Sequence, residues 1–281
     1  KGQQWERALT ALRSMEGHGP RPNVITFNAT MSACSRGRQW QRALSLLCEL
    51  EGAGPRPSLI SFNTAIGACA RGRNWLVAVH LLRRASQGCL RPGAGSYAAA
   101  VQACGAGAQW RLALRLLRQA ESALQEDPLP VHNAAISACA EGSSWPQALA
   151  LLDGVALRGR CGLQGPDVLT YDSAMSACER GRRWTLSLLL FETMVQNAML
   201  RPTLISYNAA ISACEKGAQW VQALSLLGRA SQCQEGPSTA GMSAAISACA
   251  KAKQHAVALR LSRGRGAAPL GRPAPSSHEK S

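Results

Sequence analysis

The chain has 281 residues, of which 46% are hydrophobic, and its 31 Lys and Arg against 16 Asp and Glu give a formal net charge of +15. A membrane span needs ~20 apolar residues, and none is expected because Glu192 and Gln196 interrupt the most apolar stretch, near 186–200. The basic excess favours an anionic partner, either a nucleic acid or a membrane surface, unless it serves solubility alone. Only the net charge supports a membrane surface, so we expect no membrane partner.

Tryptophan recurs at nearly constant spacing along the whole chain. Its seven positions are Trp5, Trp40, Trp75, Trp110, Trp145, Trp184 and Trp220. Seven cysteines keep the same spacing: Cys34, Cys69, Cys104, Cys139, Cys178, Cys214 and Cys249. A period of about 35 residues predicts an array of repeated units. The chain starts at Lys1, with no Met, inside a repeat, so we expect a fragment or a processed chain.

Each repeat predicts two helices. The first carries an apolar stripe at i, i+4 and i+7, which in the first complete repeat is Phe27, Met31 and Cys34. Gly37 follows as a C-cap and turn signal. The second helix carries Trp40, Ala43, Leu44 and Leu47. One hairpin cannot bury both faces, so the pattern predicts an all-α fold, a right-handed superhelical solenoid of stacked helix-turn-helix repeats.

The period also predicts the boundaries. A partial repeat with only a second helix covers 1–23, six complete repeats cover 24–238, a degenerate repeat covers 239–263, and a disordered tail covers 264–281. The complete repeats are 24–58, 59–93, 94–128, 129–167, 168–203 and 204–238. The fourth has about four additional residues, which we expect in a longer loop at Gly159–Gly165.

The repeats resemble the pentatricopeptide repeat over residues 1–263. Four first helices open with a similar string: Val-Ile-Thr-Phe-Asn (24–28), Leu-Ile-Ser-Phe-Asn (59–63), Val-Leu-Thr-Tyr-Asp (168–172) and Leu-Ile-Ser-Tyr-Asn (204–208). Tetratricopeptide repeats differ, because their Trp lies early in the first helix. The amino-acid sequence of the repeats resembles that of algal, particularly dinoflagellate, chloroplast proteins of this family. The resemblance therefore implies a chloroplast location, with the mitochondrion as the alternative.

The resemblance implies binding of single-stranded RNA, with one base read per repeat. The fifth and last residues of each repeat would read the base, and the aliphatic second residue would pack against it. The base-reading residues carried over are Asn28, Ser58, Asn63, Asn133, Asp167, Asp172, Thr203, Asn208 and Ser238. The base-packing residues are Ile25, Ile60, Leu169 and Ile205.

Particular pairs imply particular bases. Asn133 with Asp167 resembles the pair that prefers U, whereas Asn28 with Ser58 and Asn208 with Ser238 resemble a pair that prefers C. Ala98 with Pro128, in the third repeat, has no side-chain hydrogen-bonding capacity. We therefore expect a footprint C-n-n-U-n-C.

The Asn residues and the tryptophans could instead serve the fold. An Asn near a helix start is often a cap, but five residues two positions earlier are expected to cap instead: Thr26, Ser61, Ser96, Thr170 and Ser206. The Asn side chains would then be available for bases. The tryptophans lie on the stripe of the second helix, so we expect core packing rather than base stacking.

A basic residue precedes the turn Gly in most repeats. These candidate phosphate ligands are Arg36, Arg71, Arg180, Lys216 and Lys251, and Lys1 occupies the equivalent position. A favourable interaction with the helix dipole would account for the same pattern more simply. Ala106 and Glu141 are the exceptions.

No pattern predicts catalysis, a cofactor or a metal. There is no phosphate-binding G-x-x-x-x-G-K-[ST] loop, no Cys-x-x-Cys pair and no zinc deaminase signature. We expect reduced thiols, and a monomer that is not an enzyme. It would bind single-stranded RNA, with other RNA-processing proteins as further partners. The alternative function is a helical scaffold that binds proteins or peptides.

Overall fold

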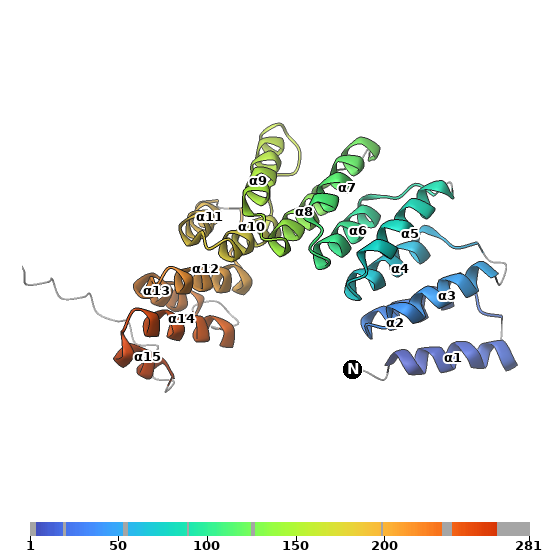
Figure 1. The fold of residues 1–281 in the computed structure, drawn as a ribbon, viewed down its shortest axis with the longest axis horizontal. Helices are drawn as coiled ribbons and strands as arrows, with labels where there is room; N and C mark the ends of the chain where they lie inside the picture. Colours follow the sequence, from blue (N-terminus) through green and yellow to red (C-terminus); the bar gives the residue numbers. More distant parts are fainter. Residues whose placement is uncertain are drawn as a thin grey trace, which may run out of the picture. The chain divides into compact units, whose positions relative to one another are not determined.

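The computed structural model describes residues 4–18, 21–52, 56–88, 90–124, 127–197, 199–231 and 238–262. These residues form fifteen α-helices and no strand, which confirms the all-α prediction. The chain divides into two compact units, Lys1–Gly181 and Arg182–Ser281, each of which is described by itself. The tail 264–281 lies outside the described residues. Figure 1 shows the helices in chain order.

The first compact unit contains a single second helix followed by four complete helix pairs and one first helix. Its first helices are α2 (Val24–Arg36), α4 (Leu59–Arg71), α6 (Ala94–Ala106), α8 (Leu129–Glu141) and α10 (Val168–Arg180). Its second helices are α1 (Gln4–His18), α3 (Trp40–Gly52), α5 (Trp75–Gln87), α7 (Trp110–Ala123) and α9 (Trp145–Arg160). The second compact unit contains α11 (Trp184–Gln196), α12 (Leu204–Lys216), α13 (Trp220–Ala230), α14 (Thr239–Lys251) and α15 (His255–Ser262).

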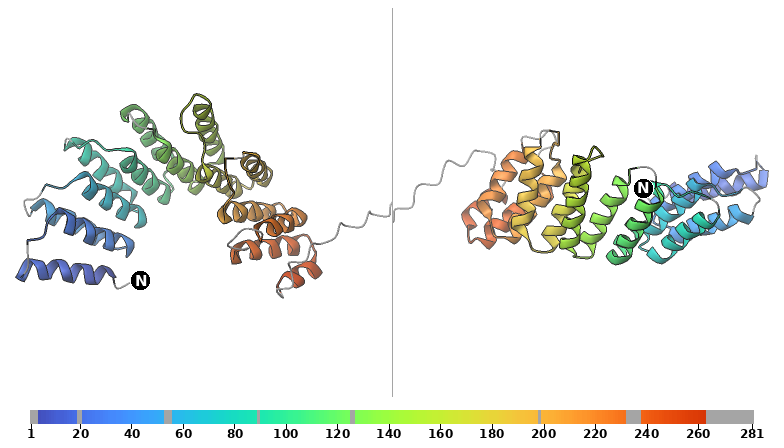
Figure 2. Two further views of the ribbon diagram at one scale, coloured as in Figure 1. Left: turned by 180° about the vertical axis from the view of Figure 1, so that it is seen from behind. Right: turned by 90° about the horizontal axis from the view of Figure 1, so that it is seen from above.

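The first helices form the continuous layer within each compact unit. Within a unit, neighbouring first helices pack on each other, as α2 does on α4 and α12 does on α14, and each also packs against the second helices next to it in that unit. Among the described residues, no second helix packs on another second helix. Figure 2 shows this succession of helix pairs from behind and from above. The first helices therefore hold their side chains at a regular spacing from repeat to repeat.

The apolar stripes account for this packing. Phe27, Met31 and Cys34 of α2 are at most 2% exposed, and their equivalents in α4 and α6 are buried as well. On the second helix, Ala43 and Leu47 are buried and Leu44 is partly buried. Because both faces are covered only by neighbouring helices, each hairpin depends on the next repeat.

The caps of the first helices differ from the prediction. The N-cap residues are Asn23, Ser58, Asp167, Thr203 and Ser238, and each accepts a hydrogen bond from a backbone N–H in the first turn. Four of the expected cappers, Thr26, Ser61, Thr170 and Ser206, instead occupy N3 and complete capping boxes. The fifth, Ser96, follows an N-cap glycine that offers no side chain. The prediction was wrong because each helix begins three residues earlier than it assumed.

The glycine after each first helix is required for a contact rather than for its backbone angle. Gly72 has φ −83°, an ordinary value, and the left-handed residue is Arg73 with φ 58°. A Cβ on Gly72 would overlap the indole ring of Trp40 from the preceding repeat. The same overlap with a preceding Trp recurs at Gly37, Gly107, Gly142, Gly181 and Gly217. The tryptophans are therefore partly buried packing residues that join successive repeats.

The additional residues of the fourth repeat lengthen a helix as well as a loop. α9 has 16 residues, against 13 in α3 and α5. Gly159 and Arg160, expected in the loop, end this helix, and a turn with Gly162 at φ 88° follows.

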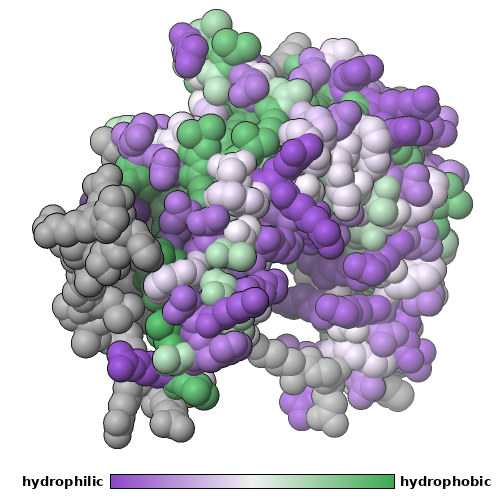
Figure 3. Space-filling model, turned by 60° about the vertical axis from the view of Figure 1, so that its left-hand side comes forward, coloured by the Kyte–Doolittle hydropathy of each residue, from purple (hydrophilic) through white to green (hydrophobic). Residues whose placement is uncertain are grey.

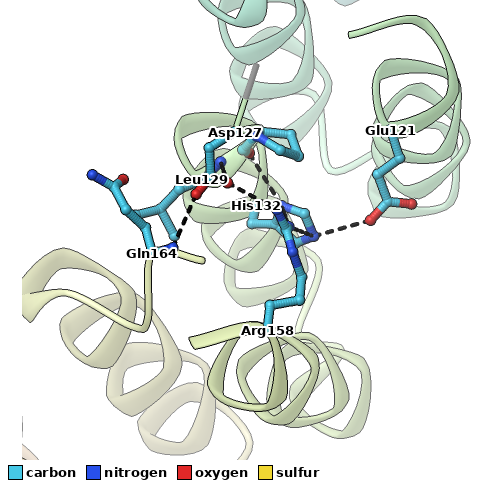
Figure 4. A network of polar contacts seen from close by, with 7 residues as sticks. Glu121, Asp127, Leu129, His132, Arg158 and Gln164 are labelled. Atoms are coloured by element: carbon cyan, nitrogen blue, oxygen red, sulfur yellow. Dashed lines mark hydrogen bonds and ion pairs between the residues drawn. The ribbon is translucent and has the colours of Figure 1, made fainter. Parts of the chain in front are cut away.

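The last turn of α9 is connected to the start of α8 by the polar network in Figure 4. Arg158 Nη2 lies 2.8 Å from Asp127 Oδ1, and the other oxygen of Asp127 accepts the backbone N–H of Gln164 at 3.2 Å. The buried ring of His132 contacts Glu121 through Nε2 at 3.0 Å. Residues of α7, α8, α9 and the following loop are thereby joined around one charged cluster.

Candidate nucleic-acid interface

In both compact units, polar side chains recur on the first helices at the fifth residue of the repeat. They are Asn28, Asn63, Asn133, Asp172 and Asn208, with Ala98 in place of the polar residue in the third repeat. All of these side chains are buried or partly buried. The helices α2, α4, α6 and α8 bring four of these positions into one row because they pack side by side.

One helical turn before these positions lie aliphatic side chains that are unusually exposed. Ile25 is 75% exposed, Ile60 65%, Leu169 59% and Ile205 66%. Residues at i and i+3 share a helix face, so each of them lies beside the fifth residue of its own repeat. Hydrophilic residues dominate the face shown in Figure 3, with hydrophobic ones between them. A single exposed aliphatic side chain is ordinary, but its recurrence at one position of the repeat indicates a ligand surface.

Asn133 and Asp167 lie in direct contact. The Asn133 Nδ2 donates to both carboxylate oxygens of Asp167 at 3.3 Å, and its Oδ1 accepts from the hydroxyl of Thr170 at 2.7 Å. Asn133 is only 7% exposed. Asp167 also caps α10, accepting the backbone N–H of Thr170 at 2.8 Å. The cap therefore holds the carboxylate beside the amide.

Asn208 and Ser238 form the equivalent pair in the second compact unit. The Ser238 hydroxyl donates to Oδ1 of Asn208 at 2.6 Å and accepts the backbone N–H of Gly241 at 2.9 Å. The fifth and last residues of a repeat are thus brought together in two repeats. In both, the last residue is also the N-cap of the next first helix.

Asn28 and Asn63 are in a different state. Their Oδ1 atoms are buried and accept no hydrogen bond from the described residues. Ser58, the predicted partner of Asn28, lies near Ser61 instead, with 3.1 Å between the two hydroxyl oxygens. Buried polar atoms are almost always hydrogen-bonded in folded proteins, so an acceptor without a donor needs a physical reason.

The basic residues lie at the C-termini of the first helices, as the sequence predicts, but several already have partners. Arg71 donates to Ser35 Oγ from both Nε (2.9 Å) and Nη2 (2.7 Å). Arg180 forms an ion pair with Glu141 at 3.1 Å, and Lys251 pairs with Glu215 at 2.9 Å. Arg36 and Lys216 are exposed. Phosphate binding by Arg180 or Lys251 would therefore require exchange of a carboxylate.

Sequence reasoning missed the residues that hold these side chains. Ser35, Glu141 and Glu215 each lie one repeat before the basic residue they contact. In the sequence, Glu141 stands out only as an exception to the basic pattern. Thr170 is predicted there only as a cap, although its hydroxyl also reaches Asn133. A search for polar residues at spacings of about one repeat could have found them.

The described residues hold no group of three potential metal ligands. Their nine cysteines are all free thiols. None of the described helices has the length and hydrophobicity to cross a membrane.

Residues 10–74 and 160–216 match the model of the pentatricopeptide repeat domain family. The chain is similar to the crystal structure of the pentatricopeptide repeat protein PPR10 from maize, with a TM-score of 0.79 and 18% identity over 96% of this chain. It is also similar to two structures of PPR10 in complex with an 18-nt psaJ RNA element, each with a TM-score of 0.72 and 18% identity over 96% of this chain. The chain spans 38% of the first of these structures and 39% of the other two. No curated protein matches it by sequence.

Proposed function

Because this chain is a pentatricopeptide repeat protein, we propose that it binds single-stranded RNA along its first helices, with one base facing each repeat. The RNA complexes of PPR10, whose fold is similar, support this proposal. The chain is proposed to act as a monomer that binds RNA without catalysing a reaction.

The observation that carries the proposal is the pair of buried amide oxygens of Asn28 and Asn63. Each accepts no hydrogen bond from the described residues, and each lies one turn after an exposed isoleucine, Ile25 or Ile60. An amide offers a donor and an acceptor to a base edge, while an aliphatic side chain offers a contact for the base plane. A nucleobase lying on the exposed isoleucine would give the adjacent amide a partner once that amide turns toward it.

The charge of the chain supports an anionic ligand. The net charge is +15, and exposed basic residues recur at the ends of first helices, as in Arg36 and Lys216. Neutralisation of phosphates by such side chains supplies much of the affinity for nucleic acids. A scaffold for proteins or peptides would not need a basic residue at the same position of most repeats.

The order of bases is proposed from the pairs. Asn133 with Asp167 would select U, and Asn28 with Ser58 and Asn208 with Ser238 would select C. Asn63, Asp172 and Thr203 complete the proposed reading positions, while Ala98 leaves the third base unread. The proposed core sequence is therefore C-n-n-U-n-C.

The cellular role that we propose is organellar RNA processing, stability, editing or translation, together with other RNA-processing proteins. The chloroplast is the proposed location and the mitochondrion the alternative, because the repeat sequences resemble those of algal chloroplast proteins of the family. A fluorescent fusion of the full-length protein tests this location, and accumulation outside both organelles would overturn it.

Fluorescence anisotropy tests RNA binding directly. The probes are a 10-nucleotide RNA containing CAAUAC, a scrambled RNA of the same composition, and the matching DNA. Tighter binding to the first RNA is expected, and replacement of Asn133 and Asn208 with Ala should reduce that preference. Equal affinity for all three strands would contradict base reading. The absence of RNA binding at low salt would overturn the proposal and favour a protein-binding scaffold.

A further inference from the structure

Thr170 joins two adjacent repeats at the candidate interface. It is the third residue of α10 in the fifth repeat, and its side chain is fully buried. Its hydroxyl oxygen lies 2.7 Å from Oδ1 of Asn133 in the fourth repeat. It also lies 2.6 Å from Oδ1 of Asp167 and accepts the backbone N–H of that residue at 3.1 Å. One hydroxyl therefore serves both a helix cap and a proposed base-reading amide.

The surrounding atoms dictate the orientation of the Asn133 amide. An ionised carboxylate only accepts hydrogen bonds, so the nitrogen of Asn133 must face Asp167. The amide oxygen then faces the Thr170 hydroxyl at 2.7 Å, whose single proton is shared between this oxygen and Oδ1 of Asp167. A half-turn of the amide would place its oxygen against the carboxylate of Asp167, which offers no donor. Both ends of the amide are consequently held before any ligand arrives.

With one N–H of Asn133 shared between the two oxygens of Asp167, the amide presents its other N–H beside that carboxylate. Uracil presents a carbonyl acceptor next to an N3–H donor, which matches an amide donor next to a carboxylate acceptor. Cytosine in the same position would place its amino donor against the amide N–H and its N3 acceptor against the carboxylate, which opposes like groups at both contacts. The orientation of Asn133 thus decides whether this pair can distinguish the two pyrimidines.

The first two repeats provide an internal comparison. Ser61 and Ser96 occupy the position of Thr170 relative to Asn28 and Asn63, and both serines are buried. The Ser96 hydroxyl has no hydrogen bond with the described residues, and the Asn28 and Asn63 oxygens accept none. The Asn amide at the fifth position is therefore hydrogen-bonded to its neighbours in the fourth repeat, whereas its oxygen has no such bond in the first two.

We propose that Thr170 is a positioning residue that sets the base selectivity of the preceding repeat by holding the Asn133 amide as a donor. This inference rests on the proposed RNA binding. It makes the fourth repeat more selective than the first two, although all three carry Asn at the fifth position.

The test compares Thr170→Val and Thr170→Ser in the whole chain. The readout is the ratio of dissociation constants for RNAs containing CAAUAC and CAACAC, which differ at the fourth base. Val retains the shape but lacks the hydroxyl, so the ratio should fall about fivefold, the factor that one net hydrogen bond contributes. Ser retains the hydroxyl and should keep the ratio. The ratio for CAAUAC against CAAUAU, which probes Asn208 at the sixth base, should remain unchanged in both variants.

Thr26→Val is the matched control. Thr26 has the same capping-box role in α2, where its hydroxyl bonds only with Asn23 among the described residues, at 2.8 Å to the backbone N–H and 2.7 Å to the carbonyl oxygen. Its replacement should lower stability as Thr170→Val does and leave both ratios intact. If Thr170→Val does not fold, as judged by circular dichroism, Thr170→Ala takes its place.

The outcomes separate the two proposals. A wild-type chain that binds no RNA overturns the proposed function, and this inference with it. A wild-type chain that prefers CAAUAC, with the preference unchanged in Thr170→Val, overturns the role of Thr170 alone. Loss of the preference in Thr26→Val as well would also contradict it, because a general effect of capping would then account for the result.

Discussion

At the scale of single residues, the asparagines at the fifth position differ in their effect on stability: some destabilise the free protein and others stabilise it. The Oδ1 of Asn63 is buried without a donor among the described residues, which costs free energy in the free protein. Asn133 instead connects Asp167 and Thr170 through three hydrogen bonds. A side chain that binds a ligand at a cost to the free protein differs in this way from one that also supports the fold.

Alanine substitution should separate these two states. Asn63→Ala should leave the free energy of unfolding unchanged or raise it by up to about 1 kcal/mol, because an unsatisfied acceptor is removed. Asn133→Ala should lower it by about 1–3 kcal/mol, because buried partners are left behind. Urea unfolding followed by circular dichroism measures both. Equal destabilisation by the two substitutions would contradict the distinction.

At the scale of helices and turns, the contact between Gly72 and Trp40 represents the junction between repeats. Ala would be compatible with the backbone at Gly72, whose φ is −83°. The obstacle is the Trp40 ring, which leaves no room for a Cβ. This contact explains why the Trp and Gly periods coincide along the chain.

Gly72→Ala should therefore destabilise the chain by about 1–3 kcal/mol through overpacking. In the double variant Gly72→Ala with Trp40→Leu, the cost should be less than the sum of the two single substitutions, because the ring is gone. Gly52→Ala is the control, since no atom lies within 4 Å of a Cβ there. Strict additivity in thermal or urea unfolding would show that the ring is not the cause.

The helices were predictable because an apolar stripe of period 3.6 must face a core wherever it occurs. The caps were not, because the helix starts three residues earlier than expected, which makes Asp167 rather than Thr170 the N-cap. The need for Gly at position 72 was not predictable either, because it arises from contact with Trp40 of the preceding repeat. The fifth-residue positions could be predicted from the repeat, whereas the partners of Asn133 and Asn63 depend on side-chain conformations that the pattern does not contain.

At the scale of the whole molecule, acidic residues form ion pairs with some of the basic residues at the C-termini of the first helices. Glu141 pairs with Arg180, and Glu215 with Lys251. Burial raises the pKa of Glu215, but hydrogen bonds from Lys251 and Ser247 and nearby charges outweigh it, so that the pKa is lowered. The number of phosphate contacts should therefore be smaller than the number of these basic residues.

Glu141→Gln should release Arg180 for phosphate. Binding to RNA at low salt should tighten, and the slope of log K against log salt should become steeper by about 0.7, the value for one contact on a single strand. Glu192→Gln, an exposed substitution on α11, changes the net charge equally and controls for it. A slope that changes equally in both variants would contradict a specific contact by Arg180.

The buried cysteine row should make stability fall at alkaline pH. Burial raises the pKa of Cys69, Cys104, Cys139 and Cys178 from 9.0 to about 11, and that of Cys214 to about 12. Because the folded state holds these protons more tightly, the stability they contribute is present below pH 9 and is lost as the pH rises through 11. Urea unfolding from pH 8 to 11 measures the decline, which Cys104→Ala should reduce. An identical decline in that variant would rule out a contribution from this thiol.

The central claim is that the asparagines at the fifth residue of the repeats select RNA bases by hydrogen bonding to them. The most direct measurement is selection of bound sequences by this chain from a fully randomised pool of single-stranded RNA, because the pool presupposes no target. We expect enrichment of C-n-n-U-n-C, with the strongest preference at U and loss of that preference in Asn133→Ala. RNA recovered without any preferred base, or a preference that survives in Asn133→Ala, would contradict it.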